Sequence, residues 1–81
     1  MRVTVRLFAQ LREVCGGSEC VCAVPAGTSV ADVWRALILR HPSLEPYGGS
    51  VTCAVNADFA KMTSSVRDGD EVAFLPPVSG G

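Results

Sequence analysis

One amphipathic helical pattern, with strand-like segments on both sides of it, constrains the fold of this chain most. Ser29 and Asp32 have the spacing of a capping box at a helix N-terminus. Apolar residues then recur at helical intervals: Val30, Val33, Trp34, Leu37 and Ile38. Because Pro42 disfavours helical angles in the residue before it, we predict that the helix ends near His41. A chain of 81 residues has room for one hydrophobic core around this helix and excludes a second domain.

Segments with the two-residue period of β-strands precede and follow the helix. Residues 2–8 alternate polar and apolar side chains, which predicts a strand that buries Val3, Val5 and Leu7. A short helical turn over residues 10–13 leads to a second strand, and a loop follows the helix. The later strands are expected at 19–24, 51–55, 59–62 and 71–75.

This order of elements predicts an α+β domain over residues 1–75, with the helix across one face of a mixed sheet. The ubiquitin-like β-grasp fold has this arrangement. In that fold the first and last strands are parallel neighbours, and the first two strands form a hairpin. We therefore expect strand 71–75 to lie beside strand 2–8, an expectation taken from the fold.

Composition argues against several classes of partner. About half of the residues are hydrophobic (48%) and the formal charge is -1. The chain therefore has no positive electrostatic potential to attract nucleic acid or anionic lipid. No apolar run approaches the ~20 residues of a membrane helix. The first fifteen residues do not resemble a signal peptide, so we expect a cytoplasmic protein.

The four cysteines are expected to be reduced thiols, because disulfides belong mainly to exported proteins. Cys20 and Cys22 point to one face of an extended segment, where small apolar side chains pack. A metal site is not expected, since His41 is the only histidine and no C-x-x-C spacing occurs.

The end of the chain carries the strongest functional signal. Pro76 and Pro77 cannot continue a strand ladder, so residues 76–81 are predicted to leave the domain as a tail. Six residues reach about 20 Å. Gly80 and Gly81 have no side chains and would pass through a narrow channel on another protein. The competing interpretation is that the C-terminal glycine pair has no function. Glycine pairs also occur at residues 16–17 and 48–49, where they resemble ordinary turns.

Strand parity predicts an apolar patch at the root of this tail. Phe8 falls on the face opposite Val3, Val5 and Leu7, and Leu75 falls outward on the last strand. If the two strands are neighbours, Phe8 and Leu75 meet, and such patches often bind partners. The alternative is scattered surface apolar residues, which are common.

Catalysis within the chain has little support. His41 lies at a helix end, and Lys61 is the only lysine and is expected to be solvated. The acidic group of Asp68, Asp70 and Glu71 surrounds a turn that is too short for a calcium loop. No glycine pattern for nucleotide binding is present. We therefore expect no intrinsically bound cofactor, and any nucleotide must come with a partner enzyme.

Two segments resemble a known family: Leu7-Phe8-Ala9-Gln10-Leu11-Arg12-Glu13, and residues 68–81, which end Phe74-Leu75-Pro76-Pro77-Val78-Ser79-Gly80-Gly81. The family is that of the molybdopterin synthase sulfur carrier subunits, within the β-grasp sulfur carriers. Residues 15–65 are similar only in their pattern of elements, and their cysteines are not a family feature.

The resemblance implies that an E1-like adenylyltransferase uses ATP to convert the Gly81 carboxylate to an acyl-adenylate. A sulfur donor, such as a persulfide-bearing sulfurtransferase, then displaces AMP and leaves a thiocarboxylate. Two carriers in turn supply the dithiolene sulfurs of molybdopterin. Catalytic residues belong to the large subunit, in a heterotetramer of two small and two large subunits. The resemblance and the tail geometry give these partner contacts: Phe8, Phe59, Leu75, Pro76, Pro77, Val78 and Ser79.

Three alternatives remain open at this point. A carrier of the same fold feeding thiazole, cysteine or transfer-RNA thiolation would use the same tail chemistry, although the Pro-Pro-Val-Ser-Gly-Gly ending favours molybdopterin. A ubiquitin-like modifier would join Gly81 to a lysine of a target protein. A plain binding module would have an inert tail.

Overall fold

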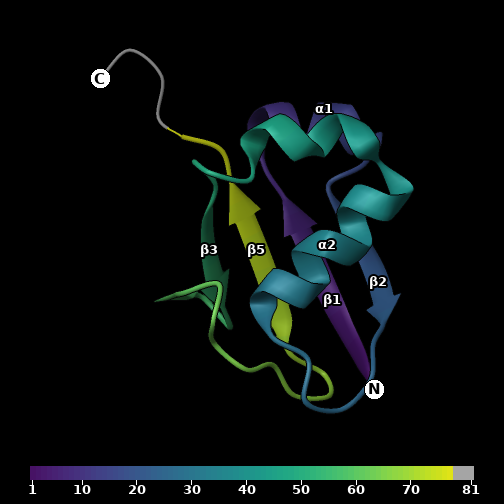
Figure 1. The fold of residues 1–81 in the computed structure, drawn as a ribbon, viewed down its shortest axis with the longest axis vertical. Coiled ribbons are helices and arrows are strands. Elements are labelled where there is room, and N and C mark those ends of the chain that lie inside the picture. Colours follow the sequence, from purple (N-terminus) through teal and green to yellow (C-terminus); the bar gives the residue numbers. More distant parts are fainter. Residues whose placement is uncertain (78–81) are drawn as a thin grey trace.

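The computed structural model describes residues 1–77 of the chain. It contains a five-stranded sheet with the strand order β2-β1-β5-β3-β4, crossed on one face by a helix (Figure 1). The elements are β1 (Arg2–Leu7), α1 (Ala9–Cys15), β2 (Glu19–Ala23), α2 (Val30–Arg40), the 3-10 helix η1 (Pro42–Tyr47), β3 (Thr52–Val55), β4 (Asp58–Ala60) and β5 (Glu71–Leu75).

The sheet is mixed. β1 is antiparallel to β2 and parallel to β5, and the register of the parallel pair places Val5 opposite Val72 and Leu7 opposite Phe74. β5 is antiparallel to β3, which continues into the β3–β4 hairpin. The first and last strands are thus neighbours, and the predicted α+β β-grasp fold is confirmed.

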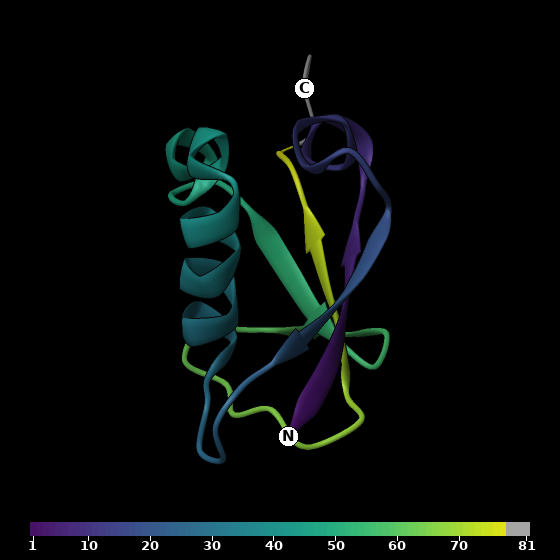
Figure 2. The same ribbon diagram turned by 90° about the vertical axis from the view of Figure 1, so that its right-hand side faces the viewer.

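The core lies between the sheet and α2, which runs along one face of the sheet (Figure 2). The predicted inward residues of β1, Val3, Val5 and Leu7, are buried. Trp34 of α2 packs against Phe74 of β5, with ring centroids 4.9 Å apart and planes tilted by 52°. Such tilted aromatic pairs stabilise a core beyond the area that they bury.

The predicted capping box opens α2. The Asp32 backbone N–H donates to Ser29 Oγ at 3.2 Å, and the Ser29 backbone N–H donates to Asp32 Oδ2 at 3.1 Å. These bonds use two amides that would otherwise have no partner at the helix start. The helix ends at Arg40, with His41 as its C-cap, as the sequence predicts.

The substitution Ser29→Ala is expected to lower the free energy of unfolding by about 1 kcal/mol, because it removes an acceptor for the orphan amides of α2. Urea unfolding followed by circular dichroism measures the loss. Ser43→Ala is the control, since Ser43 is an exposed serine of the neighbouring η1. Equal losses in the two variants would contradict a capping role.

Two segments are more ordered than the sequence predicts. The turn expected at 10–13 is the helix α1, because Leu11 is fully buried and Gly16 closes the helix in the left-handed conformation (φ 73°). The loop expected after α2 contains η1, in which Pro42 occupies the first turn and Leu44 is fully buried. Each short helix buries only one leucine. One apolar residue defines no repeat, so hydrophobic periodicity could not identify these helices from the sequence.

The short strand expected at 59–62 lies at Asp58–Ala60 instead. Asn56 and Ala57 both have positive φ, of 50° and 72°, which makes a tight two-residue hairpin turn. This turn places Asp58 directly opposite Val55, so pairing starts one residue earlier and ends at Ala60. The sequence lacks the glycine that usually marks such a turn.

Candidate functional site

The root of the C-terminal segment lies where β1 and β5 end side by side. Leu7 and Phe74 are the last residues paired across these parallel strands, and both are buried. The next residue on each strand therefore emerges at the same end of the sheet, on the opposite face. These residues are Phe8, which is 40% exposed, and Leu75, which is half-buried. The predicted exposure and shared location of this pair are confirmed.

The backbone turns sharply directly after Phe8. Phe8 is extended (φ -125°, ψ 153°) and so continues the parity of β1, whereas Ala9 adopts a positive φ of 51°. A non-glycine residue in this region is uncommon and costs free energy. The turn ends the extended path of β1 and starts α1 at Ala9.

Phe59 lies on the same outer face of the sheet, on the edge strand β4. The hairpin register places Phe59 opposite Ala54, which in turn pairs with Ala73 of β5. Phe59 is 84% exposed, so its ring stands almost free of its own domain. An aromatic side chain with so little cover is available to a partner.

Two alanines lie on the outer face of the sheet between Phe59 and strand β1. Ala54 and Ala73 are adjacent on the outer face, and Ala54 is buried. We name Phe8, Phe59, Leu75, Ala54 and Ala73 the outer patch. The two alanines were not predicted as site residues, although their outward parity and small size would have identified them.

Charges border the outer patch. Arg6 lies beside Ala73 in the β1–β5 register, and its guanidinium is 3.7 Å from the Glu71 carboxylate. Both side chains are about 45% exposed, so this pair adds little stability. It provides instead a polar rim around an apolar centre, which is the usual anatomy of a protein interface.

The acidic turn before β5 has a structural role in the described chain. Asn56 donates to Asp70 Oδ1 at 3.0 Å, and the Arg67 amide donates to Asp70 Oδ2 at 2.8 Å. These two hydrogen bonds hold the pKa of Asp70 below its usual value. The Arg2 amide donates to Asp68 Oδ1 at 2.7 Å. The turn thereby ties the β3–β4 hairpin to the start of β1.

The only histidine and the only lysine of the chain lie apart from the outer patch. His41 caps α2, and Lys61 is exposed beyond β4. Within residues 1–77, no three His, Cys, Asp or Glu side chains gather as a metal site would require. No helix in this part of the chain combines the length and apolarity needed to cross a membrane.

The four cysteines are all free thiols. Cys53 is buried and donates to the Ala60 carbonyl at 3.2 Å, and burial raises its pKa. Burial and the nearby Cys20 raise the pKa of both Cys15 and Cys22. A raised pKa lowers the fraction of thiolate at neutral pH, so these three thiols react slowly as nucleophiles.

Of the predicted tail residues, Pro76 is half-buried and Pro77 is exposed, and both leave the sheet at the end of β5. The remaining predictions, at Val78, Ser79, Gly80 and Gly81, lie outside the described residues. The structure thus places Phe8, Leu75 and Pro76 at one end of the sheet, with Phe8 and Leu75 on its outer face. Phe59 shares that face two strands away.

The model of the ThiS family matches residues 5–81. The chain belongs to the ThiS family. A relative named molybdopterin synthase sulfur carrier subunit, from Arabidopsis thaliana, is 33% identical over 81 residues, which is 100% of this chain and 84% of the relative. The Escherichia coli protein of the same name is 35% identical, covering 98% of this chain and 99% of that relative. The resemblance found in the sequence is confirmed.

Among solved structures, that of SAMP1 from Haloferax volcanii superposes with a TM-score of 0.88 at 32% identity and covers all of both chains. The likeness to this solved structure therefore includes all of the described residues, 1–77.

Proposed function

We propose that this protein is the sulfur carrier subunit of a molybdopterin synthase in molybdenum cofactor biosynthesis. The observation that carries the proposal is the position of Phe8 and Leu75 at the root of a segment ending in Gly80-Gly81, in a ThiS-family chain. Relatives with the subunit name match it from end to end. The domain presents the tail, and the Gly81 carboxylate carries the sulfur.

The chemistry requires activation of that carboxylate. A free carboxylate is a poor acyl donor because it has no good leaving group, so an E1-like enzyme first uses ATP to form an acyl-adenylate at Gly81. A persulfide-bearing sulfurtransferase then displaces AMP and forms an acyl disulfide with Gly81. A second thiol cleaves the S–S bond of this intermediate, which releases the thiocarboxylate and leaves the two donor-side sulfurs as a disulfide. The thioacid is ionised at neutral pH, and its sulfur attacks the pterin precursor bound to the large subunit.

The described residues at the tail root support placing the catalytic groups on partners. Phe8, Leu75 and Pro76 offer binding surface but no acid, base or metal ligand. The carrier therefore contributes position and a carboxylate, while the E1-like enzyme and the large subunit contribute the catalysis. We propose a heterotetramer of two small and two large subunits, acting in the cytoplasm.

A second candidate function is that of a protein modifier, because small archaeal modifier protein 1 of Haloferax volcanii is 34% identical over 94% of this chain. A modifier would join Gly81 to a target lysine by an amide bond. The two functions share the adenylation step and differ in what attacks the adenylate, so the products separate them.

Intact-mass spectrometry of the full chain, incubated with a cognate E1-like enzyme, ATP and sulfide, tests the proposal. We expect an increase of about 16 Da, the exchange of one oxygen for one sulfur, localised to Gly81. The charged protein should then form molybdopterin from the pterin precursor when the large subunit is added. Conjugates to lysine without thiocarboxylate would instead assign the modifier function.

A further inference from the structure

Strand β2 is an open edge of the sheet. The Leu7 amide donates to the Ser18 carbonyl at 2.9 Å, and the Val24 amide donates to the Met1 carbonyl at 2.8 Å. Because an antiparallel ladder alternates, the amides and carbonyls of Cys20 and Cys22 also face β1. Those of Glu19, Val21 and Ala23 face outward, where no strand of the described chain pairs with them.

This edge lacks the usual protection against pairing. Natural edge strands are shortened, bulged, or interrupted by lysine or proline. The other edge, β4, has three residues, whereas β2 has five, and residues 19–23 contain no lysine or proline. Val21 is 53% exposed on the outer face, and Leu39 of α2 is 84% exposed beside the strand. Apolar surface therefore flanks the open edge on both sides.

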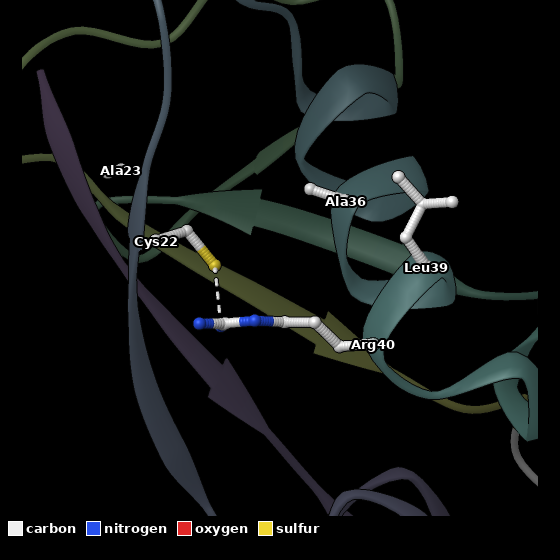
Figure 3. A pocket seen from close by; sticks show the side chains of 5 residues that line it. All are labelled: Cys22, Ala23, Ala36, Leu39 and Arg40. Atoms are coloured by element: carbon white, nitrogen blue, oxygen red, sulfur yellow. Dashed lines mark hydrogen bonds between the residues drawn. The ribbon is translucent and has the colours of Figure 1, made fainter.

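Two thiols flank Val21 on the face that is covered by α2. Cys22 lines a cavity of about 320 Å³ between β2 and α2, together with Leu39 and Arg40 (Figure 3). Arg40 Nη1 is 3.8 Å from Cys22 Sγ. Cys20 lies two residues away on the same face and is half-buried. The cavity gives the Cys22 side chain room to turn toward the strand edge.

We propose that the β2 edge binds β2 of a second copy of this chain, antiparallel and centred on Val21, and that Cys20 and Cys22 then form two intermolecular disulfides. This is the register that overlaps all five residues of the two strands. It pairs Val21 with its symmetry mate, Glu19 with Ala23, and Cys20 with Cys22 of the other copy. The interface is self-complementary, as a two-fold dimer requires.

The expected geometry suits the disulfides. In the new ladder, the outward-facing residues Glu19, Val21 and Ala23 make the hydrogen-bonded pairs. Cys20 and Cys22 therefore meet in non-hydrogen-bonded pairs, where Cα atoms are about 4.5 Å apart and side chains are closest. Disulfides span Cα separations of about 4.4–6.8 Å.

Charge complementarity favours a second copy over an unrelated strand. On the outer face, Arg2 lies beside Ala23 in the β1–β2 register. In the dimer, the small Ala23 of one copy would therefore separate its Arg2 from Glu19 of the other copy. Neither Arg2 nor Glu19 has an ion-pair partner within residues 1–77. In the dimer, Arg2 of each copy would have Glu19 of the other copy as its ion-pair partner.

The covalent step is thiol–disulfide exchange with a low-molecular-weight disulfide such as oxidised glutathione. The Cys20 thiolate attacks it, forming a mixed disulfide and releasing one glutathione thiol. Cys22 of the other copy, after losing its proton, attacks Cys20 Sγ and releases the second thiol. Each bridge thus transfers two electrons to one glutathione disulfide, and a dimer consumes two.

The test uses full-length chains with Cys15→Ser and Cys53→Ala in the background, treated with oxidised glutathione. Cys20→Ser and Cys22→Ser are made separately in this background. In the proposed register each variant alone places its thiol opposite a serine, and identical cysteines lie too far apart to bridge. Mixed together, Cys20 of one chain meets Cys22 of the other. We expect the mixture to give at least tenfold more disulfide-linked dimer, by non-reducing electrophoresis, than either variant alone.

A second comparison tests the edge itself in the wild-type background. Val21→Lys places like charges opposite each other on the two-fold axis and is expected to reduce the oxidised dimer at least tenfold. Thr52→Lys adds the same charge to an exposed position of β3 and should leave the dimer unchanged. Circular dichroism confirms that all variants are folded. Equal dimer from either single cysteine variant, loss with Thr52→Lys, or wild type that oxidises only within the monomer would overturn the proposal.

Discussion

A chain that lacks Gly81 is expected to form thiocarboxylate at least 100-fold more slowly than the full chain while keeping its stability. The deletion withdraws the carboxylate by about 3.5 Å. Misplacement of a reacting group by even 1 Å can cost about 100-fold in rate. Intact-mass spectrometry, with the E1-like enzyme, ATP and sulfide, measures the rate.

Stability should not change, because the buried core extends from Val3 to Phe74 and the deletion lies well beyond it. Thermal unfolding checks this expectation. Gly49→Ala is a matched control, since Gly49 belongs to another glycine pair and a Cβ there would meet no atom within 4 Å. Wild-type conversion of the shortened chain would refute a role for the Gly81 carboxylate. A lowered melting temperature would show that the tail supports the fold.

The separation of core and tail explains how one small domain can serve several enzymes. The large buried side chains form one core cluster, and Phe8, Phe59 and Leu75 of the outer patch are not part of it. Under the proposed function, an E1-like enzyme and a large subunit would therefore bind the outer patch in turn without disturbing the core. A carrier that must be released after each transfer benefits from such a modest, exposed surface.

The main strands and α2 were predictable because the sequence shows either a clear periodicity or a capping motif for them. The alternation in Arg2–Leu7 identified the inward face of β1, and Ser29 and Asp32 identified the start of α2. The parallel pairing of β1 with β5 came from the fold and not from any residue pattern. The short helices α1 and η1 each have a single buried leucine and a proline or glycine at one end. One apolar residue does not define a helical period, so the sequence pattern did not identify them.

Strand parity alone predicted the orientation of two residues at the tail root. Phe8 and Leu75 were correctly placed on the outer face at the tail root. Phe59 was named through the resemblance alone, because its orientation depends on the positive φ of Asn56 and Ala57. The sharp turn at Ala9 was missed for the same reason: alanine gives no sign of a left-handed conformation.

The substitution Phe59→Asp is expected to weaken binding to the large synthase subunit by at least tenfold, which is about 1.4 kcal/mol. Exposed aromatic residues often dominate binding energy when a partner buries them, and the variant would bury an unpaired carboxylate instead. Stability of the free carrier should change by no more than about 0.5 kcal/mol, because Phe59 is 84% exposed. Isothermal titration calorimetry with the purified large subunit measures the affinity.

Leu39→Asp provides a close control for this measurement under reducing conditions, where the carrier has no disulfides. Leu39 is also 84% exposed and acquires the same charge, but it lies on α2, on the opposite side of the sheet. If the outer patch carries the binding, Leu39→Asp retains wild-type affinity. Equal weakening would show that the effect is one of net charge, and selective weakening by Leu39→Asp would move the binding surface to the helical face. Only a loss specific to Phe59→Asp is compatible with a partner that reaches the tail across the open face of the sheet.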